Sequence, residues 1–247
     1  MEVNIVYNED CLETFERIDD KSIDMILCDL PYGTTACKWD TIIPFEPLWR
    51  EYKRIIKEHG AIVLTASQPF TSALVMSNIK MFKYCWVWIK NRHSSPLLAK
   101  KQPLRNYEDV CVFYKKQCVY NPQGLIAVNR VMKNSKSSGG EIVNGRRGST
   151  SLINNFTQEN TNYPTQILKF ANESNPVHGT QKPVALFEYL IKTYTNEGDM
   201  VLDNCMGSGT TAIACINTRR NYIGCELNKD YYNIIQKRIE GLQSKLL

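Results

Sequence analysis

Short hydrophobic runs and helical patterns alternate along most of the chain. Apolar runs bounded by turn residues predict buried strands at 24–29, 61–65, 84–89, 109–114, 200–203 and 221–225. Apolar residues spaced three or four positions apart predict helices at 47–58, 69–78, 183–197, in the segment that ends near 217, and from 229 onward. Strands that alternate with helices predict an α/β domain with a largely parallel sheet.

One long segment interrupts this alternation. Between about 115 and 177 the chain contains few residues that could form a core, and 134–162 is rich in Ser, Gly, Asn and Thr. Long segments of this composition are typical of functional or mobile loops. We therefore predict two halves of one domain, 1–114 and 178–247, separated by a partly mobile insertion at 115–177.

The net charge of +5 is concentrated in that insertion. It contains eight basic residues and three acidic ones, whereas the rest of the chain is balanced. A second basic stretch has no acidic residue between its ends and contains Lys90, Arg92, Lys100, Lys101 and Arg105. Such clusters fit either an ordinary solvated surface or a face that binds a polyanion.

Composition excludes several classes of protein. Hydrophobic residues make up 43% and charged residues 22%, as in a soluble globular protein. No apolar run approaches the roughly 20 residues of a membrane helix, and the N-terminus lacks the parts of a signal peptide, so we expect a cytoplasmic protein without a membrane partner. The nine cysteines form no Cys-x-x-Cys pair. Reduced, mostly buried thiols are favoured over a zinc or redox site, and we expect no metal.

Two motifs are candidates for chemistry. The first follows the strand at 200–203 and reads Asp-Asn-Cys-Met-Gly-Ser-Gly-Thr-Thr-Ala, with glycines at 207 and 209. Glycines let the backbone approach a ligand closely, and Glu226 at the end of the next strand is placed to bind the two hydroxyls of a ribose. Alone the motif is weak evidence, because a helix C-cap or packing turn explains it nearly as often, and a nicotinamide-dependent oxidoreductase uses the same geometry. Only about 40 residues follow it, so most of the sheet must come from residues before it.

The second motif is Asp29-Leu30-Pro31-Tyr32, at the carboxyl end of the first predicted strand. Ligands of open α/β sheets bind at such strand ends. Alone, the tetrapeptide also fits a proline turn with a tyrosine packed on the surface.

Together the two motifs resemble those of the S-adenosylmethionine-dependent amino methyltransferases that act on DNA. The marks of that family are Asp-Pro-Pro-Tyr and Phe-x-Gly-x-Gly, which correspond to 29–32 and 205–209. The catalytic motif comes first, the recognition region next and the cofactor motif last, which is the order in the family's β class. The segment 178–183 also resembles the corresponding segment of that class. The resemblance implies a doubly wound, mostly parallel, seven-stranded Rossmann-like methyltransferase sheet. It is circularly permuted, with a target-recognition region at 115–177.

This sequence departs from the family motifs at two positions. Leu30 replaces the first proline, which retains the main-chain carbonyl but loses some rigidity of the turn. Cys205 replaces the usual aromatic residue and alters a contact with the cofactor. We interpret both as variation within the family.

The resemblance implies roles for individual residues. S-adenosylmethionine would lie with its methionine part at the glycine motif, its ribose at Glu226 and its adenine near Asp10 and Cys11. Lys182 would meet the cofactor carboxylate, or else lie exposed at the start of a helix. The implied cofactor-binding residues are Asp10, Cys11, Asp29, Lys182, Asp203, Cys205, Gly207, Ser208, Gly209, Thr210 and Glu226.

The implied chemistry needs neither a metal nor a general base. The lone pair of an adenine N6 amine is delocalised into the ring. Acceptors at its two N–H bonds, the Asp29 carboxylate and the Leu30 carbonyl, would localise that pair toward an incoming methyl group. Pro31 would set the turn, and stacking of Tyr32 on the base, worth about 1–3 kcal/mol, would offset part of the cost of swinging the nucleotide out of the duplex.

Basic residues of both stretches would contact phosphates, whereas Trp86 and Trp88 are assigned to the core. The residues expected to bind DNA are Trp39, Lys90, Arg92, Lys100, Lys101, Arg105, Arg130, Lys133, Arg146 and Arg147.

The resulting prediction is a site-specific DNA adenine N6-methyltransferase that acts on double-stranded DNA. Methylation of cytosine N4 is the alternative within the class, where serine is more common than Asp29 at the first motif position. RNA and protein amides rank lower as substrates. From other classes, an NAD-dependent oxidoreductase and a non-catalytic DNA-binding protein stay open, as do a homodimer and a cognate restriction endonuclease as partners.

Overall fold

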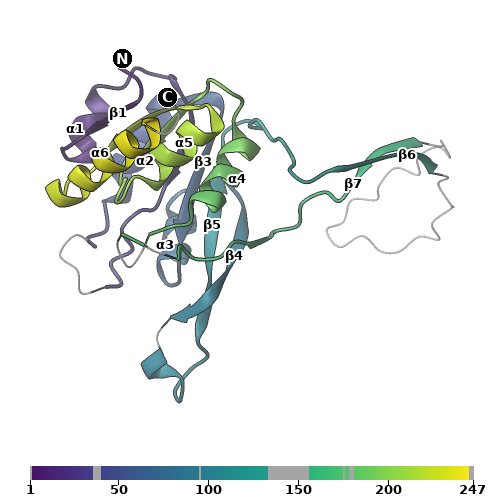
Figure 1. Cartoon of the computed structure of the whole chain (residues 1–247), viewed down its shortest axis with the longest axis horizontal. Coiled ribbons are helices and arrows are strands. Elements are labelled where there is room, and N and C mark those ends of the chain that lie inside the picture. Colours follow the sequence, from purple (N-terminus) through teal and green to yellow (C-terminus); the bar gives the residue numbers. More distant parts are fainter. Residues whose placement is uncertain are drawn as a thin grey trace. The chain divides into compact units, whose positions relative to one another are not determined.

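The computed structural model describes residues 2–35, 40–94, 96–132, 156–174, 176–177 and 181–244. The chain divides into two compact units (Figure 1). The large unit comprises Met1–Asn121 and Gln166–Leu247, and the small unit comprises Pro122–Thr165. The small unit is shorter than the insertion predicted at 115–177, because the chain has rejoined the large unit by Gln166.

The large unit contains an eight-stranded sheet in which most neighbouring strands are parallel. In spatial order its strands are β1 (Ile5–Tyr7), β10 (Asn221–Cys225), β9 (Met200–Asp203), β2 (Ile23–Cys28), β3 (Ile56–Ala66), β5 (Arg105–Phe113), β4 (Phe82–Ser94) and β8 (Ile167–Lys169). Only β5 runs antiparallel to its two neighbours. The prediction of a mostly parallel α/β sheet is thus confirmed.

The sheet has one strand more than the seven predicted. The additional strand β8 comes from the segment assigned to the insertion and pairs in parallel with β4. Leu168 of β8 is buried, and the Trp88 indole N–H donates a hydrogen bond to the carbonyl of Phe170 at 2.8 Å. A strand of three residues leaves too little pattern in the sequence to be recognised.

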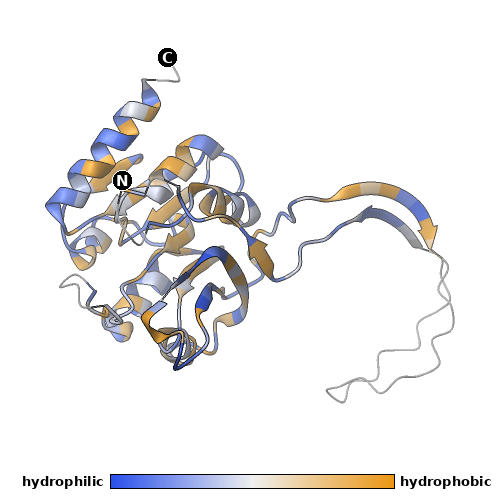
Figure 2. Cartoon of the chain, turned by 60° about the horizontal axis from the view of Figure 1, so that its bottom comes forward, coloured by the Kyte–Doolittle hydropathy of each residue, from blue (hydrophilic) through white to orange (hydrophobic). Residues whose placement is uncertain are grey.

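Helices cover both faces of this sheet, as a doubly wound fold requires. One face packs against α1 (Cys11–Glu16), α2 (Phe45–Ile55) and α3 (Phe70–Ser77). The other packs against α4 (Val184–Tyr194), α5 (Thr210–Thr218) and α6 (Lys229–Gln243). Both faces of the central strands are therefore apolar, which explains their continuous hydrophobic runs. The exposed helix α6 alternates hydrophilic and hydrophobic bands (Figure 2).

Two predicted details of the large unit are wrong or incomplete. The helix predicted at 47–58 ends at Ile55, because Ile56 already pairs with Ile23 in the sheet. The short turn between β4 and β5 contains a 3₁₀ helix at Pro96–Leu98 that the sequence did not indicate. Among the residues that the structure describes, no helix is both long and apolar enough to cross a bilayer.

The described cysteines are all free thiols, and most are buried. Six of these eight thiols are buried, whereas Cys85 and Cys205 are partly exposed. Cys37 lies outside the described residues.

The small unit contains an antiparallel ribbon where the sequence predicted no regular structure. Its strands are β6 (Ile126–Met132) and β7 (Phe156–Thr161), and the Arg130 side chain donates a hydrogen bond to the Gln158 side chain at 3.0 Å. Polar side chains dominate β7, so no hydrophobic alternation marks it as a strand. Of the residues expected to bind DNA, Lys133, Arg146 and Arg147 lie outside the described residues.

Hydrogen bonds between one indole N–H and two tyrosine hydroxyls connect α4 to β4. The Trp86 indole N–H donates to the Tyr194 hydroxyl at 2.6 Å, and the Tyr84 hydroxyl lies 3.0 Å from the same oxygen. Trp86 and Tyr194 are only 3% and 1% exposed, so neither can exchange this contact for water. The cluster matters for the site because α4 begins two residues after Lys182.

We predict that Tyr194→Phe lowers the free energy of unfolding by about 1–3 kcal/mol, because the buried Trp86 N–H loses its acceptor. Urea denaturation at neutral pH measures the change. Tyr120→Phe is the matched control, since Tyr120 is 39% exposed and packs beside Tyr194. Equal effects of the two substitutions would contradict a specific role for the buried bond.

Candidate active site

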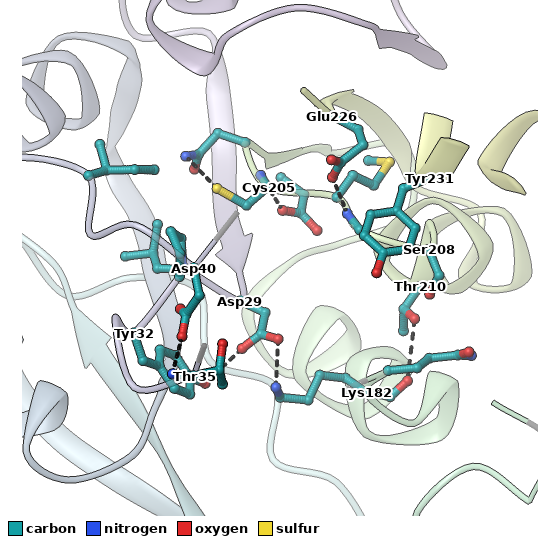
Figure 3. Close-up of a pocket in the computed structure, with 18 of the residues that line it drawn as sticks. Asp29, Tyr32, Thr35, Asp40, Lys182, Cys205, Ser208, Thr210, Glu226 and Tyr231 are labelled. Carbon is teal, nitrogen blue, oxygen red and sulfur yellow. Dashed lines mark hydrogen bonds and ion pairs between the residues drawn. The ribbon is translucent and has the colours of Figure 1, made fainter. Parts of the chain in front are cut away.

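Both sequence motifs line one cavity of about 950 Å³ in the large unit. Residues 29–32 form one part of its wall, and residues 205–208 form another (Figure 3). Their strands, β2 and β9, are parallel neighbours, with Met25 opposite Val201. The carboxyl ends of both strands therefore meet at the same edge of the sheet. The two motifs, far apart in the chain, therefore line a single pocket.

The sheet topology opens a crevice at this edge. After β2 the chain continues to α2 on one face of the sheet, and after β9 it continues to α5 on the other face. Two chain segments that leave neighbouring strands in opposite directions cannot fill the space between them, which is why open α/β sheets bind ligands at such points.

Asp29 is at the centre of a network of buried polar groups. One carboxylate oxygen, Oδ1, accepts hydrogen bonds from the hydroxyls of Tyr32, at 2.7 Å, and of Thr65. The other oxygen, Oδ2, accepts from the Lys182 ammonium at 2.6 Å. Burial alone would raise the pKa of Asp29, but the charge of Lys182 and these hydrogen bonds outweigh it and hold the pKa below its ordinary value. The carboxylate is therefore ionised at neutral pH.

Lys182 joins the two parts of the site. Its side chain is 7% exposed and pairs with Asp29 and, at 3.3 Å, with Glu108. Its main-chain carbonyl accepts a hydrogen bond from the Thr210 hydroxyl, at the first turn of α5. Burial opposes the charge of Lys182, but the two carboxylates raise its pKa above the ordinary value. The expectation of an exposed lysine at the helix start is wrong.

Tyr32 presents a neutral phenol in the cavity wall. Its ring stacks on Phe70 with a centroid separation of 5.2 Å, and the Lys182 ammonium lies 5.7 Å from its ring centroid. Burial, together with the charges of Asp29 and Glu108, raises the pKa of Tyr32 well above its ordinary value. The phenol therefore retains the proton that it donates to Asp29.

The turn after Tyr32 is fixed by a residue that the sequence did not single out. The carboxylate of Asp40 accepts hydrogen bonds from the main-chain N–H groups of Gly33, Thr34 and Thr35 at 2.7–2.9 Å. Gly33 has φ +65°, a conformation that glycine adopts without strain. Burial would raise the pKa of Asp40, but the hydrogen bonds lower it.

The turn also accommodates Leu30, which replaces the first proline of the family motif. The side chain of Leu30 is 4% exposed and packs in the core that faces α2 and α3. Leucine at this position thus adds an apolar anchor, while Asp40 fixes the backbone that follows. Together the two contacts explain how the turn is held without a second proline.

The glycine motif contacts a partly buried carboxylate. Glu226, at the end of β10, accepts hydrogen bonds from the main-chain N–H groups of Gly207 and Asn228, each at 2.8 Å. Burial raises its pKa above the ordinary value despite these bonds. Gly207 lines the cavity with φ +55°. Gly209 does not line it, because it faces Ile235 of α6, where an added Cβ would approach to 3.0 Å.

The residues around the glycine motif are held by further buried contacts. Arg238 of α6 donates two hydrogen bonds to Ser208, one to its carbonyl and one to its hydroxyl. Asp203 accepts from the Thr211 hydroxyl and from the Cys205 main-chain N–H. Burial raises the pKa of Asp203 to about 6. These contacts fix the bend that the cavity wall requires.

Cysteine replaces the family's aromatic residue at the base of the cavity. The Cys205 thiol accepts a hydrogen bond from the Asn204 side chain at 3.6 Å and packs partly against the core.

The start of α1 also lines the cavity. Asp10 caps this helix by accepting a hydrogen bond from the Leu12 N–H at 2.8 Å, and both Asp10 and Cys11 line the cavity. Burial raises the pKa of Cys11 to about 12, so its thiol is neutral. Among the described residues, no group of three or more His, Cys, Asp or Glu side chains is arranged to hold a metal ion.

A model of the family described as DNA methylase, which covers N6 and N4 enzymes, matches residues 23–237 of this sequence. The chain belongs to the DNA methylase family. Its members are the S-adenosylmethionine-dependent DNA amino methyltransferases that the two motifs resemble.

Relatives of this DNA methylase are distant but similar over nearly the whole chain. It is 26% identical to the type II methyltransferase M.HpaI of Haemophilus parainfluenzae, over 93% of this chain and 72% of that protein. It is 26% identical to M1.MboII of Moraxella bovis, over 94% and 95% of the two chains. It is also 26% identical to the DNA adenine methyltransferase YhdJ of Escherichia coli K12, over 97% and 83%.

Solved structures share the fold of the methylase. The complex of M1.HpyAVI with S-adenosylmethionine has a TM-score of 0.61 at 24% identity, covering 94% of this chain and 98% of that one. The cytosine-N4-specific PvuII DNA methyltransferase has a TM-score of 0.63 at 15% identity, covering 92% and 82%. At these identities the comparison describes the architecture alone.

The residues expected to bind DNA lie in different environments in the methylase. The Lys90 ammonium pairs with Glu108 in the cavity wall, where its side chain is 17% exposed, and its contact with DNA stays a prediction. Arg92, Lys100 and Lys101 are exposed, and Arg105 is exposed while donating to the carbonyl of Gln68. Trp39 lies outside the described residues. Trp86 and Trp88 are buried, as expected of core residues.

Sequence reasoning missed three residues that shape the site. Thr65 and Glu108 come from β3 and β5, and Asp40 follows the turn. An isolated polar residue in an apolar strand is the only local signal for Thr65. Glu108 and Asp40 have no such signal, since their partners are set by tertiary structure.

We predict that Lys182→Met moves the acidic limb of the pH–rate profile of DNA methylation to higher pH. Lys182 lowers the pKa of Asp29, so its loss leaves burial to raise that pKa, and the carboxylate is lost at a higher pH than in the wild type. Methyl transfer is measured from about pH 5 to pH 9 at saturating cofactor. Lys182→Arg, which keeps the charge, is the control and should retain most of the wild-type midpoint. An unchanged midpoint in Lys182→Met would contradict the role of the pair.

Proposed function

We propose that this DNA methylase transfers a methyl group from S-adenosylmethionine to the N6 amine of adenine. The observation that carries the proposal is the ionised, partly buried Asp29 in the same cavity as the glycine motif. An ionised carboxylate has about four acceptor sites. Tyr32, Thr65 and Lys182 occupy three of them, so one site is left for an N–H of the target amine.

The cavity fits the cofactor in size and in chemistry. Its volume of about 950 Å³ lies at the upper end of the usual range for ligand pockets, roughly 300–1,000 Å³, which leaves room for a cofactor and a base. Glu226 retains acceptor sites beyond its two main-chain donors, and we assign it to the ribose hydroxyls. We assign Gly207 and Ser208 to the methionine part, and Asp10 and Cys11 to the adenine.

Lys182 and the residues behind the glycine motif have supporting roles in this proposal. Because the Lys182 ammonium is already held between Asp29 and Glu108, we assign it to Asp29 in place of the cofactor carboxylate. Asp203, Cys205 and Thr210 support the wall against which the cofactor lies. Gly209 permits the close packing of α5 on α6.

The protein contributes acceptors and alignment to the reaction. When bound, S-adenosylmethionine supplies a methyl group already activated by its sulfonium. Asp29 and the carbonyl of Leu30 accept the two N–H bonds of the amine, which localises the nitrogen lone pair. Methyl transfer leaves the amine nitrogen positively charged, and we assign the ionised Asp29 carboxylate to accept the proton that this nitrogen then loses, so no base is needed before the transfer.

Tyr32 and the exposed basic residues would act on the DNA itself. The target base must leave the duplex to reach Asp29, at a cost of a few kcal/mol. Phe70 supports one face of the Tyr32 ring, and we assign the base to the opposite face. Arg92, Lys100 and Lys101 are free to contact phosphates, which gives binding that weakens with salt.

Cytosine N4 is the second candidate target. The same two acceptors suit any exocyclic amine on a planar ring, and the family model includes both kinds of enzyme. Aspartate at position 29 favours adenine because serine is the more common residue there in the cytosine enzymes. The two candidates leave different products in DNA.

The modified nucleoside in host DNA decides between them. The protein is expressed in a host without adenine methylation, and the digested DNA is analysed by mass spectrometry and long-read sequencing. We expect N6-methyladenine within one short sequence motif. N4-methylcytosine would support the second candidate, and unmodified DNA from a host with abundant soluble protein would contradict both.

We predict that Asp29→Ala reduces methyl transfer by about 10²- to 10³-fold or more, the usual effect of removing one positioned polar group in an active site. Transfer of radioactive methyl to duplex DNA measures the loss, and binding of S-adenosylmethionine is measured in parallel. Asp19→Ala, which removes an exposed acid, is the control and should keep wild-type activity. Activity retained in Asp29→Ala would contradict the assigned role.

A further inference from the structure

The strands β4 and β5 extend as an arm, residues 90–107, that ends in a turn (Figure 1). Ser94 pairs with Arg105 across the arm, where the Ser94 hydroxyl donates to the Arg105 carbonyl. At the tip, the N–H groups of Ala99 and Lys101 donate to the carbonyls of Pro96 and Leu98. The turn is thus held by its own main-chain bonds.

An apolar side chain projects from this turn. Leu97 is 95% exposed, the largest exposure among the large hydrophobic residues that the structure describes, followed by Met76 at 71%. A single exposed leucine is common on protein surfaces and carries no meaning by itself. Leu97 differs from other exposed hydrophobic residues because it lies at the tip of a basic arm beside the cavity.

The arm carries only positive charge and adjoins the cavity. Lys90, Arg92, Lys100, Lys101 and Arg105 lie within it, and residues 90–107 include no acidic side chain. Its base lines the cavity through Lys90, Ser94, Arg105 and Tyr107. A polyanion held by the exposed cations of the arm would therefore lie beside the opening into which a base must turn.

We propose that Leu97 is a wedge that enters the DNA duplex and occupies the space left by the target nucleotide. The proposal rests on the proposed function, because only an enzyme that extracts a base from a duplex needs such a residue. A flipped nucleotide leaves an unstacked gap in the duplex, and apolar side chains that insert between base steps compensate for lost stacking. The basic residues of the arm bring the tip to the phosphates, and the adjoining cavity receives the base.

Charge favours DNA over a second copy of this chain as the occupant. Two copies meeting through their arms would place like charges against each other without any acid in either arm. The duplex instead offers phosphates for the cations and an apolar stack of bases for Leu97.

The test compares two duplexes that carry the methylated sequence found in host DNA. In one the target is paired normally, and in the other it lies opposite an abasic site, which weakens its hold in the helix. Leu97→Ala should reduce kcat/KM on the paired duplex about fivefold to tenfold but by less than about twofold on the abasic duplex, where extraction of the base is easier. Leu97→Met, which keeps an apolar side chain of similar size, should retain most of the wild-type activity on the paired duplex.

Ile79→Ala is the matched control, since Ile79 is 55% exposed and precedes β4 at the end of the sheet opposite the cavity. It should leave both rates within about twofold of wild type. An equal loss on both duplexes for Leu97→Ala, or no loss on either, overturns the wedge. A change in oligomeric mass caused by Leu97→Ala also overturns it, because that side chain would then lie between copies. If the wild type methylates neither duplex, the proposed function fails first.

Discussion

The ion pair between the buried Lys182 and the partly buried Asp29 is the interaction on which the site depends. Both ends of Lys182 are engaged: its ammonium holds Asp29 after β2, and its main-chain carbonyl holds Thr210 at the start of α5. One residue thus couples the turn that carries the acceptors to the helix that follows the glycine motif. Breaking a buried pair from one side is costly because it leaves a charge without compensation. Here Glu108 and Lys90 extend the pair into a cluster of two acids and two lysines, whose formal charges cancel.

The topology of the sheet brings these groups together from distant parts of the chain. Because β2 and β9 are parallel neighbours, the residues after each strand meet at the same edge, although Asp29 and Gly207 are far apart in sequence. The cofactor motif can therefore come last in the chain without changing the geometry of the cavity. The order of segments instead determines where the small unit is inserted in the chain. It lies between β5 and β8 in the sequence and not at either end of the domain.

The parts that could be predicted from sequence are those with local causes. The strands at 24–29 and 200–203 were recognisable because buried parallel strands are continuously apolar, and the two motifs follow directly from them. The role of Asp40 and of Glu108 could not be predicted, since each depends on partners that only the folded chain supplies. The partner of Lys90 could not be predicted either, because Glu108 is brought next to it only by the pairing of β4 with β5. The short strand β8 and the polar strand β7 have no hydrophobic alternation that would distinguish them from loops.

The most direct test of this arrangement is a crystal structure of the protein with S-adenosylhomocysteine, the product form of the cofactor. We predict that the ligand lies between Asp10 and the bend at Gly207, with the Glu226 carboxylate on its ribose hydroxyls and its sulfur directed toward the 29–32 turn. Lys182 should remain paired with Asp29. A ligand bound outside this cavity, or one whose sulfur points away from Asp29 while Lys182 leaves the carboxylate, would contradict the assignment of the two walls.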